Sequence, residues 1–430
     1  MKHSNDGEFS GERGLHALVE LIQSGEALRA IEMCSANPEL ALAKGRTGRT
    51  ALMVSARMGE MKMLAELAPI SNCHAIDHQG RSALLDAAWG FEPEHGPAAA
   101  RLILGGAKIG SAEEEPPRIG RAIAVAAERQ MPGFVAEALG AFSKISCERQ
   151  EALDEALLAA ARGGCVESAR LLVQAGAEAV AKDKSGRDAV MWAAARGSMD
   201  LLLAAINSGS ALEKDNYGKT ALMIAAQAGN VDIVKALMPW SNLRDINNHR
   251  QTALMLAAAG GCPKCVEALL PGSDVLAADR DGATALMRAA EGGVLEVLEA
   301  LLPASSANAA DRNQDTSLAK AIRGGKEACV EVLAPLVNIH QKNKDGRSPL
   351  ALAMSSSQSI LRAVIRAGLA QERALGKNGA QAMRKEWRTT FARHGGESAG
   401  QALFDAEVER FEMDASAGNR ESAKARALRV

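Results

Sequence analysis

The sequence predicts an all-α repeat solenoid of about ten stacked helix-turn-helix units, with an N-terminal partial unit and a helical C-terminal tail. A recurring segment, Thr-Ala-Leu-Met, begins at Thr50, Thr220, Thr252 and Thr284. Its spacing is regular, because a step of 32 residues separates successive copies from Asp188 to Ser348. The 430 residues include only 7 Phe, 4 Trp and 1 Tyr. Few large side chains are therefore available for one deep core, whereas small stacked units do not need them.

The unit from Asp215 to Ile246 shows why each copy should form two helices. Its Asp-Asn-Tyr-Gly start is a turn signal, and Thr220 has the chemistry of a helix N-cap. The apolar stretch that follows is expected to be a short helix ending at Gly229. A second helix is expected over 231–237, where apolar residues recur at helical spacing. Two such short helices cannot bury their apolar faces alone, so each unit must stack on its neighbours.

This pattern resembles the ankyrin repeat. The agreement with the family's general form is best over 164–178, together with the Asp-x-x-Gly-x-Thr-x-Leu pattern from Asp215 to Leu222. Looser copies in the same frame extend the resemblance to about 11–375. The Pro that usually follows the Thr survives only as Pro349. The family's His two positions further on is replaced by methionine at Met53, Met191, Met223, Met255 and Met287.

These methionines are expected to fill the core, because they recur once per unit and form no cluster. Loss of the His puts in doubt the hydrogen-bond network that it usually forms between successive turns. The Thr-Ala-Leu-Met variant is also similar to the large ankyrin families of diplomonad flagellates. Some members of those families are cytoskeletal, and this narrower likeness implies a cytoskeletal role as an alternative function.

The resemblance implies four parts of the chain. They are a flexible N-terminus (1–10), an N-terminal capping partial repeat (11–44), ten ankyrin repeats (45–375) and a helical C-terminal tail or cap (376–430). The tail carries two apolar stripes at helical spacing, Met383, Trp387 and Phe391, then Phe404, Val408 and Phe411. We expect it to cover the last unit, and the alternative is an amphipathic helix that docks on a partner or an acidic lipid surface.

Charge and composition limit the function classes. With 50 basic and 52 acidic residues, the composition argues against nucleic-acid binding through a broad basic surface, and we expect no nucleic-acid partner; a local basic patch stays open. No apolar run approaches membrane-spanning length, the first residues are polar, and the seven cysteines are scattered. We expect a cytoplasmic protein, and association with the cytoskeleton is the alternative.

Several short motifs resemble chemical sites but fit the repeat better. Gly218-Lys219-Thr220 lacks the earlier Gly of a phosphate-binding loop. Cys262 and Cys265 have CxxC spacing without a second pair, and Cys265 falls at an inward helix position. Asp279-Arg280-Asp281-Gly282 lacks the Glu that would end a calcium loop. We therefore predict no enzyme activity, no catalytic residue, no cofactor and no metal; an enzyme that uses Cys262 or Cys265 would need accessible thiols.

If the resemblance holds, the turn tips and the exposed face of the first helices form a concave groove for a partner protein. Two tip positions in the eight clearest units carry ten Lys or Arg against one acid, which indicates a basic edge and an acidic partner. Solvated turns also favour charge, and that alternative stays open. Trp89 and Tyr217 are candidate anchors because aromatic residues dominate binding hot spots, unless they pack on neighbouring units.

The partner-binding candidates are Arg49, Arg81, Trp89, Lys184, Arg187, Asn216, Tyr217, Lys219, Arg280, Arg312, Lys344 and Arg347. The sequence therefore predicts a non-enzymatic scaffold that binds another protein through the concave face and tips. The alternative is a structural cytoskeletal protein whose basic tips engage an acidic polymer such as microtubules.

Overall fold

A computed structural model shows stacked pairs of helices and confirms the predicted fold class. The residues that it describes are 6–106, 116–142, 149–179, 181–206, 213–374, 385, 388–390, 401–410 and 413. Helices account for all of the regular structure there, apart from isolated bridges that join Ile76 to Ser82 and Ala310 to Thr316. The chain divides into two compact units, unit 1 (Met1–Asn216) and unit 2 (Tyr217–Val430).

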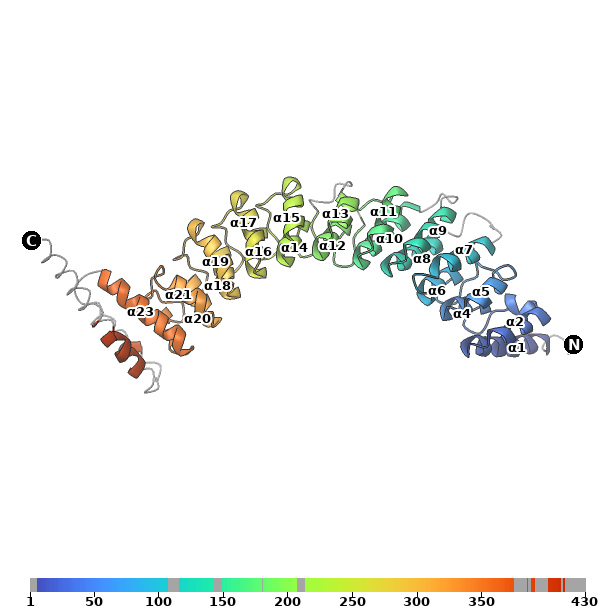
Figure 1. Ribbon diagram of the computed structural model, residues 1–430, viewed down its shortest axis with the longest axis horizontal. Helices are drawn as coiled ribbons and strands as arrows, with labels where there is room; N and C mark the ends of the chain where they lie inside the picture. Colours follow the sequence, from blue (N-terminus) through green and yellow to red (C-terminus); the bar gives the residue numbers. More distant parts are fainter. Residues whose placement is uncertain are drawn as a thin grey trace, which may run out of the picture. The chain divides into compact units, whose positions relative to one another are not determined.

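The helices of unit 1 form two layers. They are α1 (Asp6–Gln23), α2 (Ala27–Ala36), α3 (Glu39–Leu42), α4 (Ala51–Met58), α5 (Met61–Leu67), α6 (Ala83–Gly90), α7 (Gly96–Gly106), α8 (Pro116–Glu128), α9 (Pro132–Phe142), α10 (Arg149–Gly163), α11 (Val166–Gln174), α12 (Ala189–Arg196) and α13 (Met199–Ala205). From α4 to α12 the even-numbered helices pack on one another in succession, and so do the odd-numbered helices from α5 to α13 (Figure 1). We call these the first-helix layer and the second-helix layer. Helix α1 packs on α4 and α2 packs on α5, so the N-terminal partial unit continues both layers. Helix α1 begins at Asp6, inside the segment 1–10 for which the sequence predicts a flexible N-terminus.

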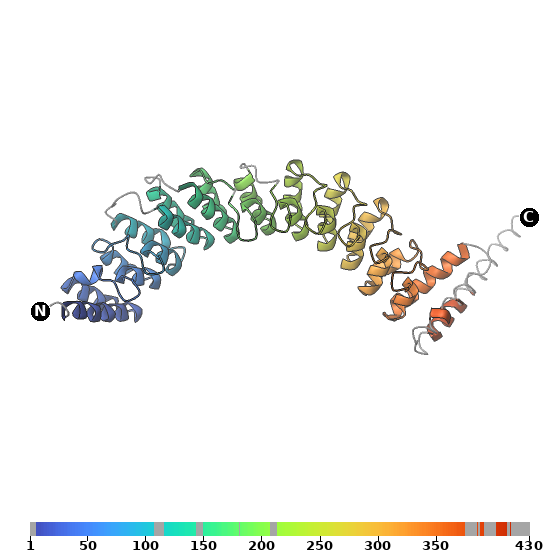
Figure 2. The same cartoon turned by 180° about the vertical axis from the view of Figure 1, so that it is seen from behind.

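Unit 2 repeats the same arrangement more regularly. Its elements are α14 (Ala221–Ala228), α15 (Val231–Leu237), η3 (Met238–Trp240), α16 (Ala253–Gly260), α17 (Pro263–Leu269), η4 (Leu270–Gly272), α18 (Ala285–Gly292), α19 (Leu295–Leu301), η5 (Leu302–Ala304), α20 (Ser317–Arg323), α21 (Glu327–Leu333), α22 (Pro349–Ala353) and α23 (Gln358–Ala374). The even-numbered helices again form the first-helix layer and the odd-numbered ones the second-helix layer, as the opposite view also shows (Figure 2).

The recurring Thr starts each first helix by capping it. Thr220 Oγ1 accepts a hydrogen bond from the backbone N–H of Met223 at 3.3 Å, which satisfies one of the free donors of α14. At the other end Gly229 adopts a left-handed conformation with φ of 77°. The same N-cap bond is made by Thr50, Ser82, Asp188, Thr252, Thr284, Thr316 and Ser348.

Small and flexible apolar side chains make up the interior. The methionines that replace the family's His are all at most 1% exposed, which confirms their predicted core role. Alanines such as Ala225 and Ala257 are fully buried and let neighbouring helices approach closely. At Gly90 the approach is closer still, because a Cβ there would lie 2.2 Å from the carbonyl oxygen of Ala56.

The C-terminal tail contacts the last helix. Residues 401–410 are helical, and within them Phe404 and Val408 are buried. Glu407 accepts a hydrogen bond from Arg366 Nε at 2.7 Å and pairs with Arg362 on the same helix, α23. The first predicted stripe, Met383, Trp387 and Phe391, lies outside the described residues, as does Phe411.

Candidate partner-binding surface

Six of the hairpin tips that the structure describes are built around one Asp or Asn side chain, whereas the first tip has Gly45 at that position. In the tip before α18, Asp279 Oδ1 accepts hydrogen bonds from the backbone N–H groups of Asp281 and Ala283, both at 2.9 Å. The side chain thereby closes the turn that the sequence predicted. The same pair of bonds, to the residues two and four positions later, is made by Asp77, Asp183, Asn247, Asp311 and Asn343.

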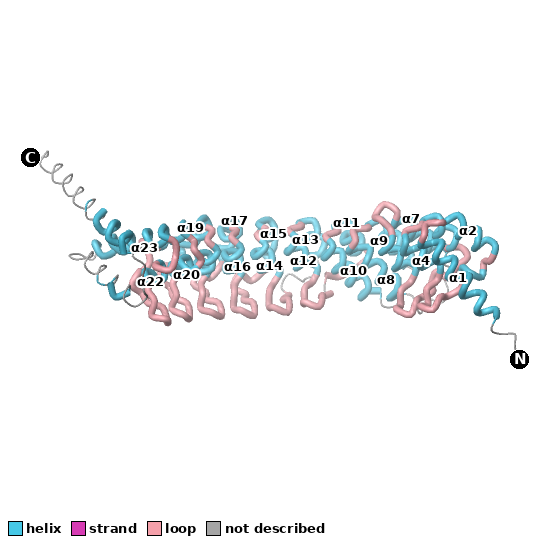
Figure 3. Tube along the Cα trace, turned by 90° about the horizontal axis from the view of Figure 1, so that it is seen from below, coloured by secondary structure: helices cyan, strands magenta, loops and turns pink. Residues whose placement is uncertain are grey.

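Successive tips are joined by backbone hydrogen bonds. We number the tip positions from the Asp or Asn that closes the turn, so that Asp279 is first and Ala283 fifth. In unit 2 the N–H of the second tip residue donates to the carbonyl of the third residue of the preceding tip at 2.8–2.9 Å. The pairs are Asn248 to Tyr217, Arg280 to His249, Arg312 to Asp281 and Lys344 to Asn313. We call this series the tip ladder. In Figure 3 the loops that form it project next to one another from one edge of unit 2. The backbone of three candidate residues, Arg280, Arg312 and Lys344, is therefore fixed by the ladder.

The fourth tip position requires a left-handed backbone and leaves little room for a side chain. Gly282 has φ of 82°, and a Cβ there would lie 2.8 Å from the backbone nitrogen of Arg312. Two units depart from glycine: Arg250 and Gln314 occupy this position with φ of 61° and 58°. Arg250 was not among the candidates, although its place in an otherwise glycine-rich column could have identified it.

The candidate cations of the first tips in unit 1 neutralise buried carboxylates. Arg81 Nε donates to Asp77 Oδ2 at 2.9 Å, and Arg49 lies 3.4 Å from both Asp77 Oδ2 and Asp86 Oδ1. Burial opposes ionisation of Asp77, but bonds from Arg81 and Gln79 lower its pKa overall. Burial raises the pKa of Asp86 despite the charge of Arg49. Both arginines are about a quarter to a third exposed, so they serve the fold as well as the surface.

Arg187, the next candidate in unit 1, is used similarly. Its Nε lies 3.7 Å from Asp215 Oδ2, and its guanidinium lies 5.4 Å from the ring centre of Trp192. Lys184 and Asn216 are exposed and linked, since Asn216 Nδ2 donates to the carbonyl of Lys184 at 3.0 Å.

In unit 2 the tip carboxylates are neutralised from the first helices instead. Arg288 Nε donates to Asp279 Oδ2 at 3.0 Å, and Lys320 Nζ lies 2.9 Å from Asp311 Oδ2. Arg323 pairs with the buried Asp315. The exposed Asp281 and Asp345 are also paired, at 3.3 and 3.7 Å, with Arg288 and Arg323 respectively.

Most basic tip residues of unit 2 are exposed, as are Arg46 and Lys184 at the second tip position in unit 1. Five of those in unit 2 are exposed and form no ion pair or side-chain hydrogen bond with any residue that the structure describes: Arg250, Arg280, Arg312, Lys344 and Arg347. Lys219 differs, because its Nζ donates to Gln227 Oε1 at 2.7 Å.

The two candidate anchors are both exposed. Tyr217 is 56% exposed at its tip. Trp89 is 48% exposed near the end of α6, between the guanidinium groups of Arg57 and Arg129, which lie 5.6 and 5.9 Å from its ring centre. Trp240, in the turn η3 on the second-helix side, is 64% exposed and was not anticipated.

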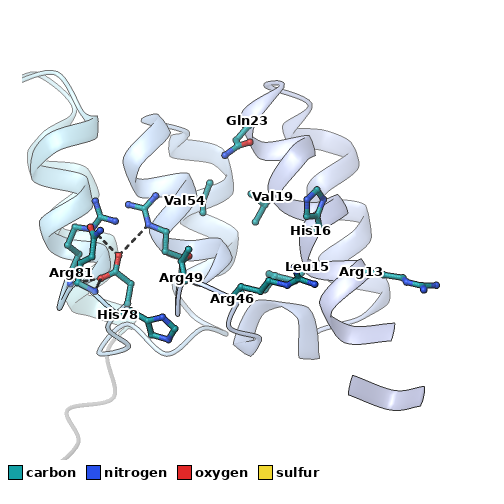
Figure 4. A pocket seen from close by; sticks show the side chains of 14 residues that line it. Arg13, Leu15, His16, Val19, Gln23, Arg46, Arg49, Val54, His78 and Arg81 are labelled. Carbon is teal, nitrogen blue, oxygen red and sulfur yellow. Dashed lines mark hydrogen bonds and ion pairs between the residues drawn. The ribbon is translucent and has the colours of Figure 1, made fainter. Parts of the chain in front are cut away.

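A pocket of about 890 Å³ lies in unit 1 between α1 and the first tips (Figure 4). It is lined by Arg13, Leu15, His16, Val19, Gln23, Gly45, Arg46, Thr47, Arg49, Val54, Asp77, His78, Gln79 and Arg81. Its one acidic lining residue, Asp77, is already bound by Arg49 and Arg81. Arg13, Arg46 and His78 are exposed around it, so the pocket is electropositive.

The motifs that resembled chemical sites belong to the repeat. Gly218 occupies the left-handed tip position and Thr220 caps α14, which accounts for Gly218-Lys219-Thr220. Cys265 is fully buried, and burial raises its pKa to about 12, which confirms its predicted core role. Within the described part of the chain, no group of His, Cys, Asp or Glu is arranged to hold a metal ion, and no helix has both the length and the apolar character needed to cross a membrane.

A family model described as ankyrin repeats (3 copies) matches residues 156–249, 190–279, 240–311 and 286–374. These overlapping matches together span 156–374, just over half of the chain. No curated protein matches the chain. Neither comparison supports the narrower likeness to diplomonad families.

Proposed function

The chain belongs to the ankyrin-repeat family, and from that premise we propose that it is a non-enzymatic scaffold that binds a partner protein through its hairpin tips and first-helix layer. Ankyrin repeats generally mediate interactions between proteins. The observation that carries the proposal is the tip ladder, which fixes the backbone of exposed polar and charged residues in unit 2. A surface fixed in this way loses little conformational entropy when a partner binds.

The proposal divides the candidate residues into those that stabilise the hairpins and those that contact the partner. Arg49, Arg81 and Arg187 stabilise the hairpins through their ion pairs, and contribute to binding mainly by shaping the surface. Tyr217 and the outward-pointing cations of unit 2 are available for contact. An aromatic anchor beside long cationic side chains is typical of interface hot spots.

The test is capture of partner proteins by the full chain and by two double variants. Tyr217→Ala with Lys219→Ala should reduce capture at least about tenfold, because it removes a hot-spot aromatic and its neighbouring charge. The matched control, Trp240→Ala with Lys235→Ala, removes the same kinds of side chain from the second-helix side of unit 2. Both variants should melt at the temperature of the unmodified chain.

Loss of capture by the control, with capture retained by the tip variant, would assign binding to the second-helix layer and refute this part of the proposal. A large drop in the melting temperature of the tip variant would show instead that Tyr217 and Lys219 are structural.

A second candidate function is a cytoskeletal component whose basic tips bind an acidic polymer such as microtubules. The outward-pointing cations of unit 2 favour it. Binding of this kind should weaken steeply between low and physiological salt, because exposed charges are screened. An interface anchored by Tyr217 should change much less, so co-sedimentation with the polymer at several salt concentrations separates the two functions.

A further inference from the structure

The tip ladder of unit 2 places three cations at a regular spacing. Arg280, Arg312 and Lys344 occupy the same position in consecutive tips, 32 residues apart. Each step consists of one peptide unit, about 3.8 Å, and one hydrogen-bonded backbone step, about 4.8 Å. With the two steps in line, one rung of the ladder is at most about 9 Å, within the roughly 8–10 Å between packed helices.

These cations are available to an external ligand. None of the three forms an ion pair with a residue that the structure describes. The exposed acids at the same tips, Asp281 and Asp345, lie 3.3 and 3.7 Å from Arg288 and Arg323, each of which also pairs with a buried Asp. The backbone nitrogens of all three are bound in the ladder, so only the side chains can adjust.

We propose, building on the scaffold function above, that the ladder of Arg280, Arg312 and Lys344 binds an extended acidic segment of a partner protein in a polyproline II conformation, with one carboxylate at every third residue. In that conformation three residues advance about 9.3 Å and return to the same face, so carboxylates at i, i+3 and i+6 meet successive rungs. Each guanidinium can bind a carboxylate through two parallel hydrogen bonds, and the ammonium of Lys344 acts as a point charge.

Other backbone conformations fit the ladder less well. In a β-strand, alternate residues on one face advance about 6.7 Å, so over two rungs they fall about 5 Å short. An α-helix presents same-face residues at about 5.4 Å per turn. The charge of the three residues therefore selects an acidic ligand, and the estimated spacing favours one carboxylate at every third residue of a polyproline II segment.

Fluorescence anisotropy of labelled synthetic peptides with the full chain tests the proposal. The probe is four repeats of Glu-Pro-Pro, which favours polyproline II. A peptide of the same composition with its four Glu residues consecutive tests periodicity, and four repeats of Gln-Pro-Pro test charge. We expect the periodic acidic peptide to bind most tightly, and its binding to fall with added salt.

Matched variants of the protein test the site. Arg280→Ala, Arg312→Ala and Lys344→Ala together should weaken binding of the periodic peptide at least about tenfold. The control combines Lys235→Ala, Arg244→Ala and Lys264→Ala, which removes three exposed charges elsewhere in unit 2, and should change affinity less than about twofold.

Three results would overturn the proposal: no binding of the periodic peptide, equal binding of the peptide with consecutive Glu, or equal losses in the two triple variants. If any of these occurs while the Tyr217 and Lys219 variant still loses partner capture, the scaffold function survives and only the ladder assignment fails.

Discussion

The hairpin tips of unit 1 and unit 2 carry similar basic residues, yet these residues meet different partners. In unit 1, Arg49 and Arg81 lie against the buried carboxylates of Asp77 and Asp86. In unit 2, Asp279 and Asp311 are paired instead with Arg288 and Lys320 of the first helices. Arg347, at the same tip position as Arg49 and Arg81, is exposed.

An arginine at the fifth tip position pairs with a buried carboxylate where no first-helix cation does so, as Arg49 and Arg81 do. A buried carboxylate needs a cation or strong hydrogen bonds to remain ionised, and the closest cation supplies them. Where a first helix provides that cation, as Arg288 does for Asp279, the carboxylate is paired without an arginine at the fifth tip position, which is Ala283 in that unit.

The largest expected effect concerns the ladder on which the exposed edge of unit 2 depends. Gly282→Ala should lower the free energy of unfolding by about 2–3 kcal/mol, because the new Cβ meets the backbone of Arg312 and the left-handed backbone becomes strained. Gly346→Ala is the control, since Gly346 has φ of 73° but nothing within 4 Å of its Cβ position; it should cost about 1 kcal/mol. Urea denaturation followed by circular dichroism measures both, and equal losses would mean that the tips are independent loops.

A smaller effect tests the comparison directly. Arg49→Ala should destabilise the protein by about 2 kcal/mol, because Asp77 loses one of its two cations and the fully buried Asp86 loses its pairing with Arg49. Arg312→Ala should change the free energy of unfolding by less than about 0.5 kcal/mol, as expected of an exposed side chain without a partner. Thermal and urea denaturation of both variants provide the measurement. Equal destabilisation by the two substitutions would remove the distinction between the units.

A further prediction concerns Asp188, which is an aspartate at the N-cap position where unit 2 has Thr or Ser. Its Oδ1 accepts from the N–H of Met191 at 2.7 Å, and burial raises its pKa to about 6. The folded state holds the proton of Asp188 more tightly than the unfolded chain does. The free energy of unfolding therefore falls as the pH rises from about 4 through 6. Asp188→Thr keeps the cap and should add about 1 kcal/mol at pH 7.5, with the gain vanishing near pH 4.

Urea denaturation of Asp188→Thr and the unmodified chain across that pH range tests the sign. A gain that stays constant with pH would show that Asp188 does not titrate as its burial indicates.

The fold could be predicted from the sequence because its determinants are local. Thr220 and Gly229 specify the start and end of a helix within one unit, and repetition at 32 residues requires stacking. Burial of the Met column and of Cys265 followed from the same frame.

The roles of the tip residues could not be predicted, because they depend on contacts between units. Arg49 reaches Asp86, 37 residues later, only when two units stack at the observed distance. Arg280 and Arg49 both belong to the basic tip edge, at the second and the fifth tip position respectively, and of the two only Arg49 pairs with buried carboxylates. The pocket near α1 likewise combines residues from three segments whose proximity no local pattern encodes.

The tip ladder also means that the length of the basic edge is set by the number of repeat units that form it. Each additional 32-residue unit would add one rung, and deletion of a whole unit would remove one without disturbing the bonds between those that remain. On the proposed binding mode, the number of carboxylates that a partner can present is then set by the number of units with a basic residue at the second tip position. The contacts within each rung stay the same.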